Sequence, residues 1–318
     1  LVKLLLPLNL CALYPYPVKD GADIPIQYYA YVISFLGIAA YIIYSLRFSK
    51  KIVFGMGFFF AAVFLVLQLL PVGNAIMADR YSYIPSIGIF YLAGEGFNLL
   101  WSKKLKLAAI ILLGAFTVLF SIKTYARCGV WKNDMTLWND VIGQYQTIEN
   151  AYYNRGIVFM NENRNDEALS DFNKTIELKP DYPEAYINRG LVFMNEKRIE
   201  EALNDFNKAI ELKPDYTDAY YNRGNVLINA KRNDEALSDF NKAIELNPDF
   251  AKAYNNRGIV FINEKRNDEA LKDFNKAIEL KPGYVDAYNN RGIVFMNEKR
   301  NDEALNDFNK AIELKPDY

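Results

Sequence analysis

The sequence predicts an all-α protein in which a polytopic bundle of transmembrane helices is followed by an α-solenoid of stacked helix pairs. From residue 149 onward an Arg-Gly pair, first seen at Arg155-Gly156, recurs every 34 residues, and a proline follows it with the same period. A fixed period of this length with two helical stretches per unit is typical of stacked helix–turn–helix repeats. Before residue 149 the chain is instead rich in long apolar runs, which predict membrane spans.

The composition limits the kinds of site that the chain can hold. Its 318 residues include no histidine and two cysteines, Cys11 and Cys128, and the formal net charge is −1. Histidine triads and histidine metal ligands are therefore excluded, and two thiols are too few for a thiolate metal site, so we expect no metal. The two thiols either stay unpaired or form one bridge. The sequence has no strongly basic surface and no nucleic-acid-binding motif, so we expect no nucleic acid partner.

Residues 1–127 contain four apolar stretches that are long enough to be membrane spans. They cover about residues 28–46, 52–70, 87–101 and 105–126, and residues 1–10 resemble the end of a further helix, so we expect a piece of a longer protein. A soluble all-α domain is the alternative, but runs such as MGFFFAAVFLVLQLL have no polar face. We therefore expect a multi-pass integral protein of a bacterial inner membrane or an endomembrane, in contact with membrane lipid.

The loop charges predict the orientation of these spans. Lysines and arginines gather between the first and second spans and between the third and fourth, so both loops should be cytoplasmic. The loop between the second and third spans should face outward. The segment after the fourth span, including all the repeats, then lies on the periplasmic or lumenal side.

The outward loop at residues 78–86, ADRYSYIPS, is a candidate lipid-phosphate or sugar site formed by Asp79, Arg80, Tyr81 and Tyr83. Arginine offers a fork of donors to a phosphate, and aromatic rings stack on sugars. A structural ion pair at the start of a helix is the alternative. Glu95 is a further candidate, because a carboxylate inside a span is costly and should face protein or a polar cavity.

Residues 128–148 are predicted to form an amphipathic connecting helix. Apolar side chains, among them Trp131, Trp138 and Val141, recur there at helical spacing. Such a helix either lies on the membrane surface or caps the first repeat. Capping is favoured, because the repeats follow without a linker.

Residues 149–318 divide into five units of nearly the same sequence: 149–182, 183–216, 217–250, 251–284 and 285–318. If each unit is numbered from 1 to 34, position 4 is tyrosine, position 8 glycine, position 20 alanine, position 24 phenylalanine and position 32 proline. The glycine should let the two helices approach closely, and the proline should end the second helix. This pattern resembles the tetratricopeptide repeat. Arginine at position 7 and aspartate at position 23 are interpreted as a surface ion pair of small structural value.

The first helices of such an array line a concave groove, and asparagines dominate it here. They occupy positions 6 and 13 of every unit and position 9 of the third. An amide both donates and accepts, so this ladder should hold extended or unfolded polypeptide; a structural role for position 6 is the alternative. Positions 5, 9 and 13 lack the basic residues that a clamp for a C-terminal carboxylate needs. The candidate groove residues are Asn154, Asn161, Asn188, Asn195, Asn222, Asn225, Asn229, Asn256, Asn263, Asn290 and Asn297.

The segments YPYP and LLPVGNAIMADRYSYIPSIG, followed by a tryptophan-bearing amphipathic stretch and the repeats, resemble one family. It is the transmembrane and tetratricopeptide-repeat O-mannosyltransferase-like proteins of the GT-C glycosyltransferase superfamily, in their C-terminal portion. The resemblance implies transfer of a sugar, usually mannose, from a polyprenyl-phosphate donor to protein hydroxyls outside the membrane. It also implies that the catalytic acidic residues lie in a loop upstream of this sequence. No carboxylate here is therefore assigned to catalysis, and no cofactor is expected besides the donor substrate.

Two functions are compatible with these features. The first is the membrane-embedded, acceptor-binding part of a protein glycosyltransferase that uses a polyprenyl-phosphate-linked sugar, with the repeats binding extended polypeptide. The second is a non-catalytic, membrane-anchored scaffold for protein–protein interactions in envelope assembly.

Overall fold

The computed structural model describes residues 37, 40–47, 49–66 and 83–316. These residues form two compact units, 1–151 and 152–318, and their regular elements are helices. The all-α prediction is confirmed for this part of the chain. Asp79, Arg80 and Tyr81, with most of the first predicted span, lie outside the described residues.

The first unit contains helices α3 (Lys50–Val66), α4 (Tyr83–Ser102), α5 (Lys106–Val130) and α6 (Asp134–Gln144). Helix α3 packs against α4, and α4 packs against α5. Rings contribute to the first contact, since the centroids of Phe54 and Tyr91 lie 5.2 Å apart in an edge-to-face arrangement.

Helix α5 is the one helix within the described ranges that is long and apolar enough to cross a membrane. Its most apolar window has a mean hydropathy of 2.1, and 6% of that window is buried. Large apolar side chains such as Leu107, Ile111 and Ile122 are more than half exposed along it. A soluble helix of this composition would bury such a surface. Within the described residues the structure therefore supports one membrane span. It does not show, in this part of the chain, the predicted bundle of several spans.

Helix α6 begins at Asp134, within the predicted segment 128–148, and Asn133 caps it. The Asn133 side chain accepts from the backbone N–H of Thr136 at 2.9 Å, and the Thr136 hydroxyl accepts from the backbone N–H of Asn133 at 3.3 Å. Farther along α6, Val141 packs with Ile148 and Ala151 in a buried cluster. The apolar face of α6 is therefore covered by the chain that leads into the repeats.

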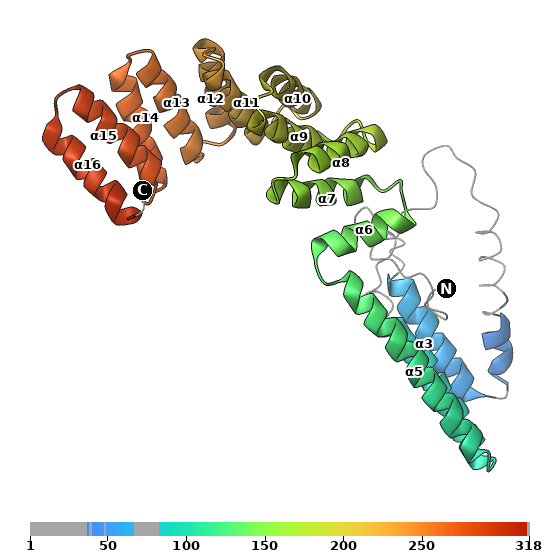
Figure 1. Cartoon of the computed structure of the whole chain (residues 1–318). Coiled ribbons are helices and arrows are strands. Elements are labelled where there is room, and N and C mark those ends of the chain that lie inside the picture. The colour runs from blue at the N-terminus through green and yellow to red at the C-terminus, as the bar shows by residue number, and fades with distance from the viewer. Residues whose placement is uncertain (1–36, 38–39, 48, 67–82, 317–318) are drawn as a thin grey trace. The chain divides into compact units, whose positions relative to one another are not determined.

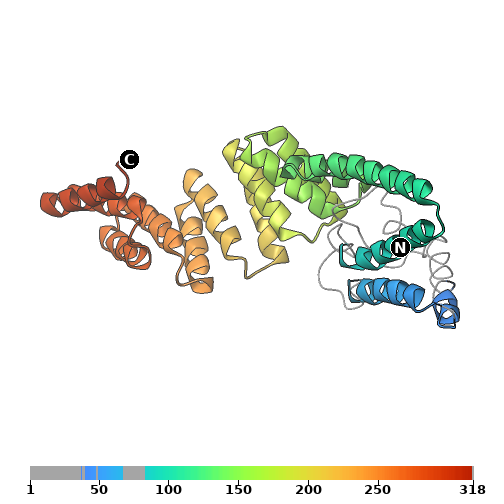
Figure 2. The same cartoon turned by 90° about the horizontal axis from the view of Figure 1, so that it is seen from below.

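The repeats fold as five pairs of helices, each pair formed by one 34-residue unit (Figures 1 and 2). The first helices contact one another along the array, α9 with α11, α11 with α13 and α13 with α15, and so line its inner face. The pairs are α7 (Glu149–Asn161) and α8 (Asn165–Leu178), α9 (Pro183–Asn195) and α10 (Ile199–Leu212), α11 (Thr217–Asn229) and α12 (Asn233–Leu246), α13 (Ala251–Asn263) and α14 (Asn267–Leu280), and α15 (Val285–Asn297) and α16 (Asn301–Leu314).

A glycine and a phenylalanine set the close approach of the two helices in each pair. A Cβ atom built on Gly258 of α13 would lie 2.6 Å from a ring carbon of Phe274 in α14, which is fully buried. The equivalent distance is 2.7 to 2.9 Å in the other four repeats. The predicted role of the glycine is confirmed, because no side chain fits between the helix and the ring.

The turn between the helices of each pair contains one residue in the left-handed conformation. Position 15 has φ between 57° and 61° in all five repeats, at Asn163, Lys197, Lys231, Lys265 and Lys299. This region is unfavourable for residues with a Cβ. Glycine is the residue that most often ends a helix this way.

We expect Lys231→Gly to raise the free energy of unfolding by about 0.5–1 kcal/mol, because it relieves this backbone conformation. Urea unfolding followed by circular dichroism measures the change. Lys242→Gly, inside α12, is the matched control and should lower stability by about 1 kcal/mol. A Lys231→Gly protein less stable than the parent would contradict the prediction.

Candidate peptide-binding face of the repeat array

One arginine in each first helix ties the two helices of its repeat together. Arg223 of α11 donates from Nε and Nη2 to the two carboxylate oxygens of Asp239 in α12, at 2.7 and 2.6 Å. The Asp239 side chain is 4% exposed. The same pair forms between positions 7 and 23 of every repeat. The predicted pair exists, but it is not a surface pair, because helix packing buries the aspartate.

Each arginine from the second repeat onward also reaches the preceding repeat. Nη1 of Arg223 donates to Oδ1 of Asn207 in α10 at 2.6 Å. The three equivalent bonds, from Arg189, Arg257 and Arg291, measure 2.5 to 2.6 Å. Asparagine at position 25 therefore links neighbouring repeats. Sequence reasoning missed this link, although the signal was present as an asparagine at position 25 of all five units.

The charge of the buried aspartates depends on these arginines. Burial raises the pKa of the Asp205 and Asp239 carboxyls, and the hydrogen bonds from Arg189 and Arg223 oppose that effect. The hydrogen bond to Asp239 in turn raises the pKa of Arg223. The arginine therefore counteracts the effect of burial on these two carboxyls.

The asparagines at position 6 are half-buried, and the amides of three of them, Asn188, Asn256 and Asn290, bond to the preceding repeat. Asn188 donates from Nδ2 to the hydroxyl of Tyr153 at 3.0 Å, and burial raises the pKa of that tyrosine. Asn290 donates to Oδ1 of Asn255 at 3.0 Å. Both bonds span from one first helix to the next. The structural interpretation of position 6 therefore holds for these two asparagines.

A chain of amides continues through the third repeat. Asn255 donates from Nδ2 to Oδ1 of Asn256 at 2.9 Å, and Asn256 donates to Oδ1 of Asn225 at 2.6 Å and to the hydroxyl of Tyr221 at 3.2 Å. Asn225 ends this chain with its own Nδ2 group, at the position where the other repeats carry isoleucine or leucine. It thus offers a polar donor within an otherwise aliphatic row.

The asparagines at position 13 remain available to a ligand. They form an exposed row at the ends of the first helices, one from each repeat. The row consists of Asn161, Asn195, Asn229, Asn263 and Asn297. With the half-buried aliphatic side chains of position 9, they make a face without formal charge, which suits a polypeptide backbone and uncharged side chains.

Of the candidate residues of the first unit, the described part of the chain contains Tyr83 and Glu95, both on α4. Tyr83 begins α4, and Glu95 lies 12 residues farther along that helix, about 18 Å away at the usual rise per residue. Glu95 pairs instead with Nζ of Lys51, at 2.5 Å, and its side chain is 30% exposed. The pair explains how the carboxylate is accommodated.

No group of acidic and cysteine side chains suited to a metal ion occurs among the described residues. The described carboxylates that are buried, at position 23, are held by arginine.

The sequence profile of the tetratricopeptide repeat matches residues 149–182, 217–250, 251–284 and 285–318, and a related TPR profile matches 193–230. Together with the helix pairs, these matches show that the chain belongs to the tetratricopeptide-repeat proteins. A solved structure, YrrB, described as a TPR protein with an unusual peptide-binding site, is 29% identical. The match covers 57% of this chain and 93% of that one, with a TM-score of 0.47.

The resemblance to O-mannosyltransferases is also confirmed. The chain is 25% identical over 187 residues to Protein O-mannosyl-transferase F38B6.6 of Caenorhabditis elegans, covering 57% of this chain and 26% of the relative. It is 27% identical over 150 residues to Protein O-mannosyl-transferase Tmtc3 of Drosophila melanogaster, covering 43% and 15%. The chain spans about a quarter or less of the length of these relatives.

Proposed function

We propose that this chain is the membrane-embedded, acceptor-binding portion of a protein glycosyltransferase that uses a polyprenyl-phosphate-linked sugar. The similarity to two O-mannosyl-transferases supports the reaction class. The exposed asparagine row at position 13 supports the acceptor role, and it is the observation on which the proposal mainly rests. In this proposal the repeats present extended or unfolded polypeptide to the membrane part of the enzyme.

The inner face fits an extended acceptor because it combines amides with aliphatic side chains. A strand that lies along the first helices exposes backbone N–H and C=O groups at regular intervals, and the position-13 amides can pair with either kind. The aliphatic residues at position 9 would contact alternate side chains. Charged acceptor segments would gain no partner from these two rows.

The proposal includes four spans, at about residues 28–46, 52–70, 87–101 and 105–126, with the repeats on the periplasmic or lumenal side. The exposed apolar surface of α5 supports the last span. Protease treatment of sealed vesicles tests the orientation. Cleavage within the repeats from the outer side alone is expected, and cleavage from the cytoplasmic side alone would overturn it.

Peptide binding tests the proposed face directly. The full chain in nanodiscs is titrated with a labelled peptide of about ten alternating valine and serine residues, long enough to span several repeats. Asn195→Ala combined with Asn229→Ala should weaken binding roughly thirtyfold, because two amide hydrogen bonds contribute about 2 kcal/mol. Asn204→Ala with Asn306→Ala, two exposed asparagines of second helices, is the matched control. Equal losses in both double variants would contradict the proposed face.

Sugar transfer is tested on the longer protein that contains the upstream region. Replacing Asp79 and Arg80 together with alanine should abolish transfer from the polyprenyl-phosphate donor to protein, since we propose that Arg80, paired with Asp79, holds the donor phosphate and that Tyr81 and Tyr83 stack on the sugar. Unchanged transfer would show that Asp79 and Arg80 do not bind the donor. Peptide binding by the repeats should survive this change.

A membrane-anchored scaffold without catalysis is the second candidate. It is favoured by the inner face of the repeats, which holds amides and aliphatic side chains and no reacting group. The sugar-transfer assay on the longer protein, combined with the peptide titration, separates the two functions. A longer protein that binds the peptide but transfers no sugar, with Asp79 and Arg80 intact, would establish the scaffold.

A further inference from the structure

The third repeat differs from the other four at a point where an aromatic ring is otherwise fixed. Position 11 is phenylalanine in those four repeats and Leu227 in the third. Position 14 is glutamate in the same four and Ala230 in the third. Both differences fall beside Arg223 and Arg232, so the two arginines have a different environment in this repeat.

In the other four repeats the phenylalanine ring lies between two guanidinium groups. The arginine of position 16 is 4.2 to 4.4 Å from the ring centroid, and the arginine of position 7 is 5.6 to 5.8 Å from it. These distances fall within the range of cation–π attraction. Three of the four rings, Phe159, Phe193 and Phe295, are 8 to 9% exposed. The repeat fold therefore defines a well-ordered position for an aromatic ring.

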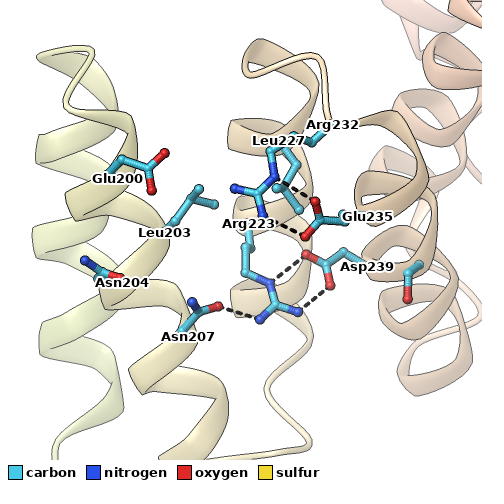
Figure 3. A pocket seen from close by; sticks show the side chains of 10 residues that line it. Glu200, Leu203, Asn204, Asn207, Arg223, Leu227, Arg232, Glu235 and Asp239 are labelled. Carbon is cyan, nitrogen blue, oxygen red and sulfur yellow. Dashed lines mark hydrogen bonds and ion pairs between the residues drawn. The ribbon is translucent and has the colours of Figure 1, made fainter.

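A pocket of about 330 Å³ lies beside Leu227 in the third repeat, between α10, α11 and α12 (Figure 3). Arg223 and Arg232 both line it, and Leu203 and Leu227 supply its apolar surface. Because a cavity of about 150 Å³ can hold benzene, this volume accommodates a phenylalanine or tyrosine side chain.

The loss of the glutamate leaves one arginine with fewer acceptors. In the other four repeats Nη1 of the position-16 arginine donates to the glutamate of position 14, at 3.0 to 3.1 Å. In the third repeat Arg232 pairs with Glu235 through Nε and Nη2, both at 2.7 Å, and Ala230 supplies no acceptor for Nη1. A carbonyl oxygen of a bound polypeptide would restore this bond.

We propose that this pocket binds a phenylalanine or tyrosine side chain of a partner polypeptide, with its ring between Arg223 and Arg232. The partner supplies the ring that the other repeats carry within the chain, and one of its peptide carbonyls accepts from Arg232. The site is formed by two second helices and the first helix between them. It is therefore separate from the asparagine row, and it does not depend on the proposed sugar transfer.

The probe is N-acetyl-4-fluorophenylalaninamide, titrated into the full chain in nanodiscs and followed by fluorine NMR. We expect one saturable site, and Leu227→Phe should weaken binding by at least about tenfold because the new ring fills the pocket. Arg232→Gln, which keeps the fold and removes one cation, should weaken it severalfold. N-acetyl-leucinamide should compete poorly, since an aliphatic side chain gains no cation–π attraction.

A complementary variant tests the geometry from the opposite direction. Phe193→Leu combined with Glu196→Ala gives the second repeat the two features of the third and should create a second site, which raises the number of probes bound from one to two. Absence of saturable binding to the parent chain would overturn the proposal, and so would unchanged binding in Leu227→Phe. A double variant that still binds one probe would overturn the assignment of the ring position.

Discussion

Replacing Arg223 with alanine is expected to lower the free energy of unfolding by about 3 kcal/mol. The change leaves the Asp239 carboxylate, which is 4% exposed, without a cation, and it removes the bond to Asn207 in the preceding repeat. Removing one partner of a buried ion pair costs about 3–5 kcal/mol, and the partial exposure of the arginine places this case at the lower end. Urea unfolding of the full chain in detergent, followed by circular dichroism, measures the loss.

The free energy of unfolding that Arg223→Ala loses should depend on pH. Burial already raises the pKa of Asp239, and removing Arg223 also removes the influence that lowers it. A carboxyl whose pKa is higher in the folded than in the unfolded state favours folding below the unfolded value, and that contribution is lost as pH rises through the folded value. The stability difference between the parent and Arg223→Ala should therefore narrow as pH falls from about 7 to about 4.

Two variants separate this explanation from a general loss of packing. Adding Asp239→Asn to Arg223→Ala should recover part of the stability, because the unpaired charge is gone. Arg300→Ala removes an arginine that pairs with Glu298 and Glu303, which are 26% and 51% exposed, and that lies over the Phe295 ring, and it should cost about 1–2 kcal/mol. Equal losses for Arg223→Ala and Arg300→Ala would contradict the role of the buried pair.

Replacing Gly258 with alanine is expected to lower the free energy of unfolding by about 2 kcal/mol. The new methyl group would lie 2.6 Å from the ring of Phe274, which is fully buried and has no space to withdraw. Inserting a methyl group into a packed core typically costs about 1–3 kcal/mol. The same urea titration measures the change.

Gly283→Ala is the matched control for this effect. A Cβ atom at Gly283 would meet nothing within 4 Å, so this variant should keep the parent stability. Adding Phe274→Leu to Gly258→Ala should recover part of the loss by making room for the methyl group. Parent-like stability of the Gly258→Ala protein would mean that the helices separate without cost at this contact.

The repeat array could be predicted closely from the sequence because each predicted feature depends on residues within a single 34-residue unit. The close approach of the two helices at the glycine was expected from the repeat pattern, and the phenylalanine 16 residues later in the same unit is the side chain that the glycine meets. The bond from Arg223 to Asn207 has the same separation of 16 residues but crosses between units. Asn207 and Asp239 lie equally far from Arg223 in the sequence, and spacing alone does not predict that the arginine reaches both.

The candidate site was predicted less completely. Spacing placed the position-6 and position-13 asparagines on the same helices, but packing between neighbouring repeats decides which amides are used internally. Asn188 bonds to Tyr153, whereas Asn195 is exposed. The ring position at Phe193 also follows from tertiary contacts with two arginines. Periodicity does not report such contacts, because they join residues on different helices.

The hydrogen bond between position 25 of one repeat and position 7 of the next makes the junctions interchangeable. Any repeat that keeps these two residues can follow any other, so a gene duplication or deletion of one whole unit should produce a chain that still folds. Duplicating the fourth unit would only lengthen the inner face. Duplicating the third would also copy Leu227 and Ala230, so evolution could increase the number of aromatic-binding pockets by recombination alone.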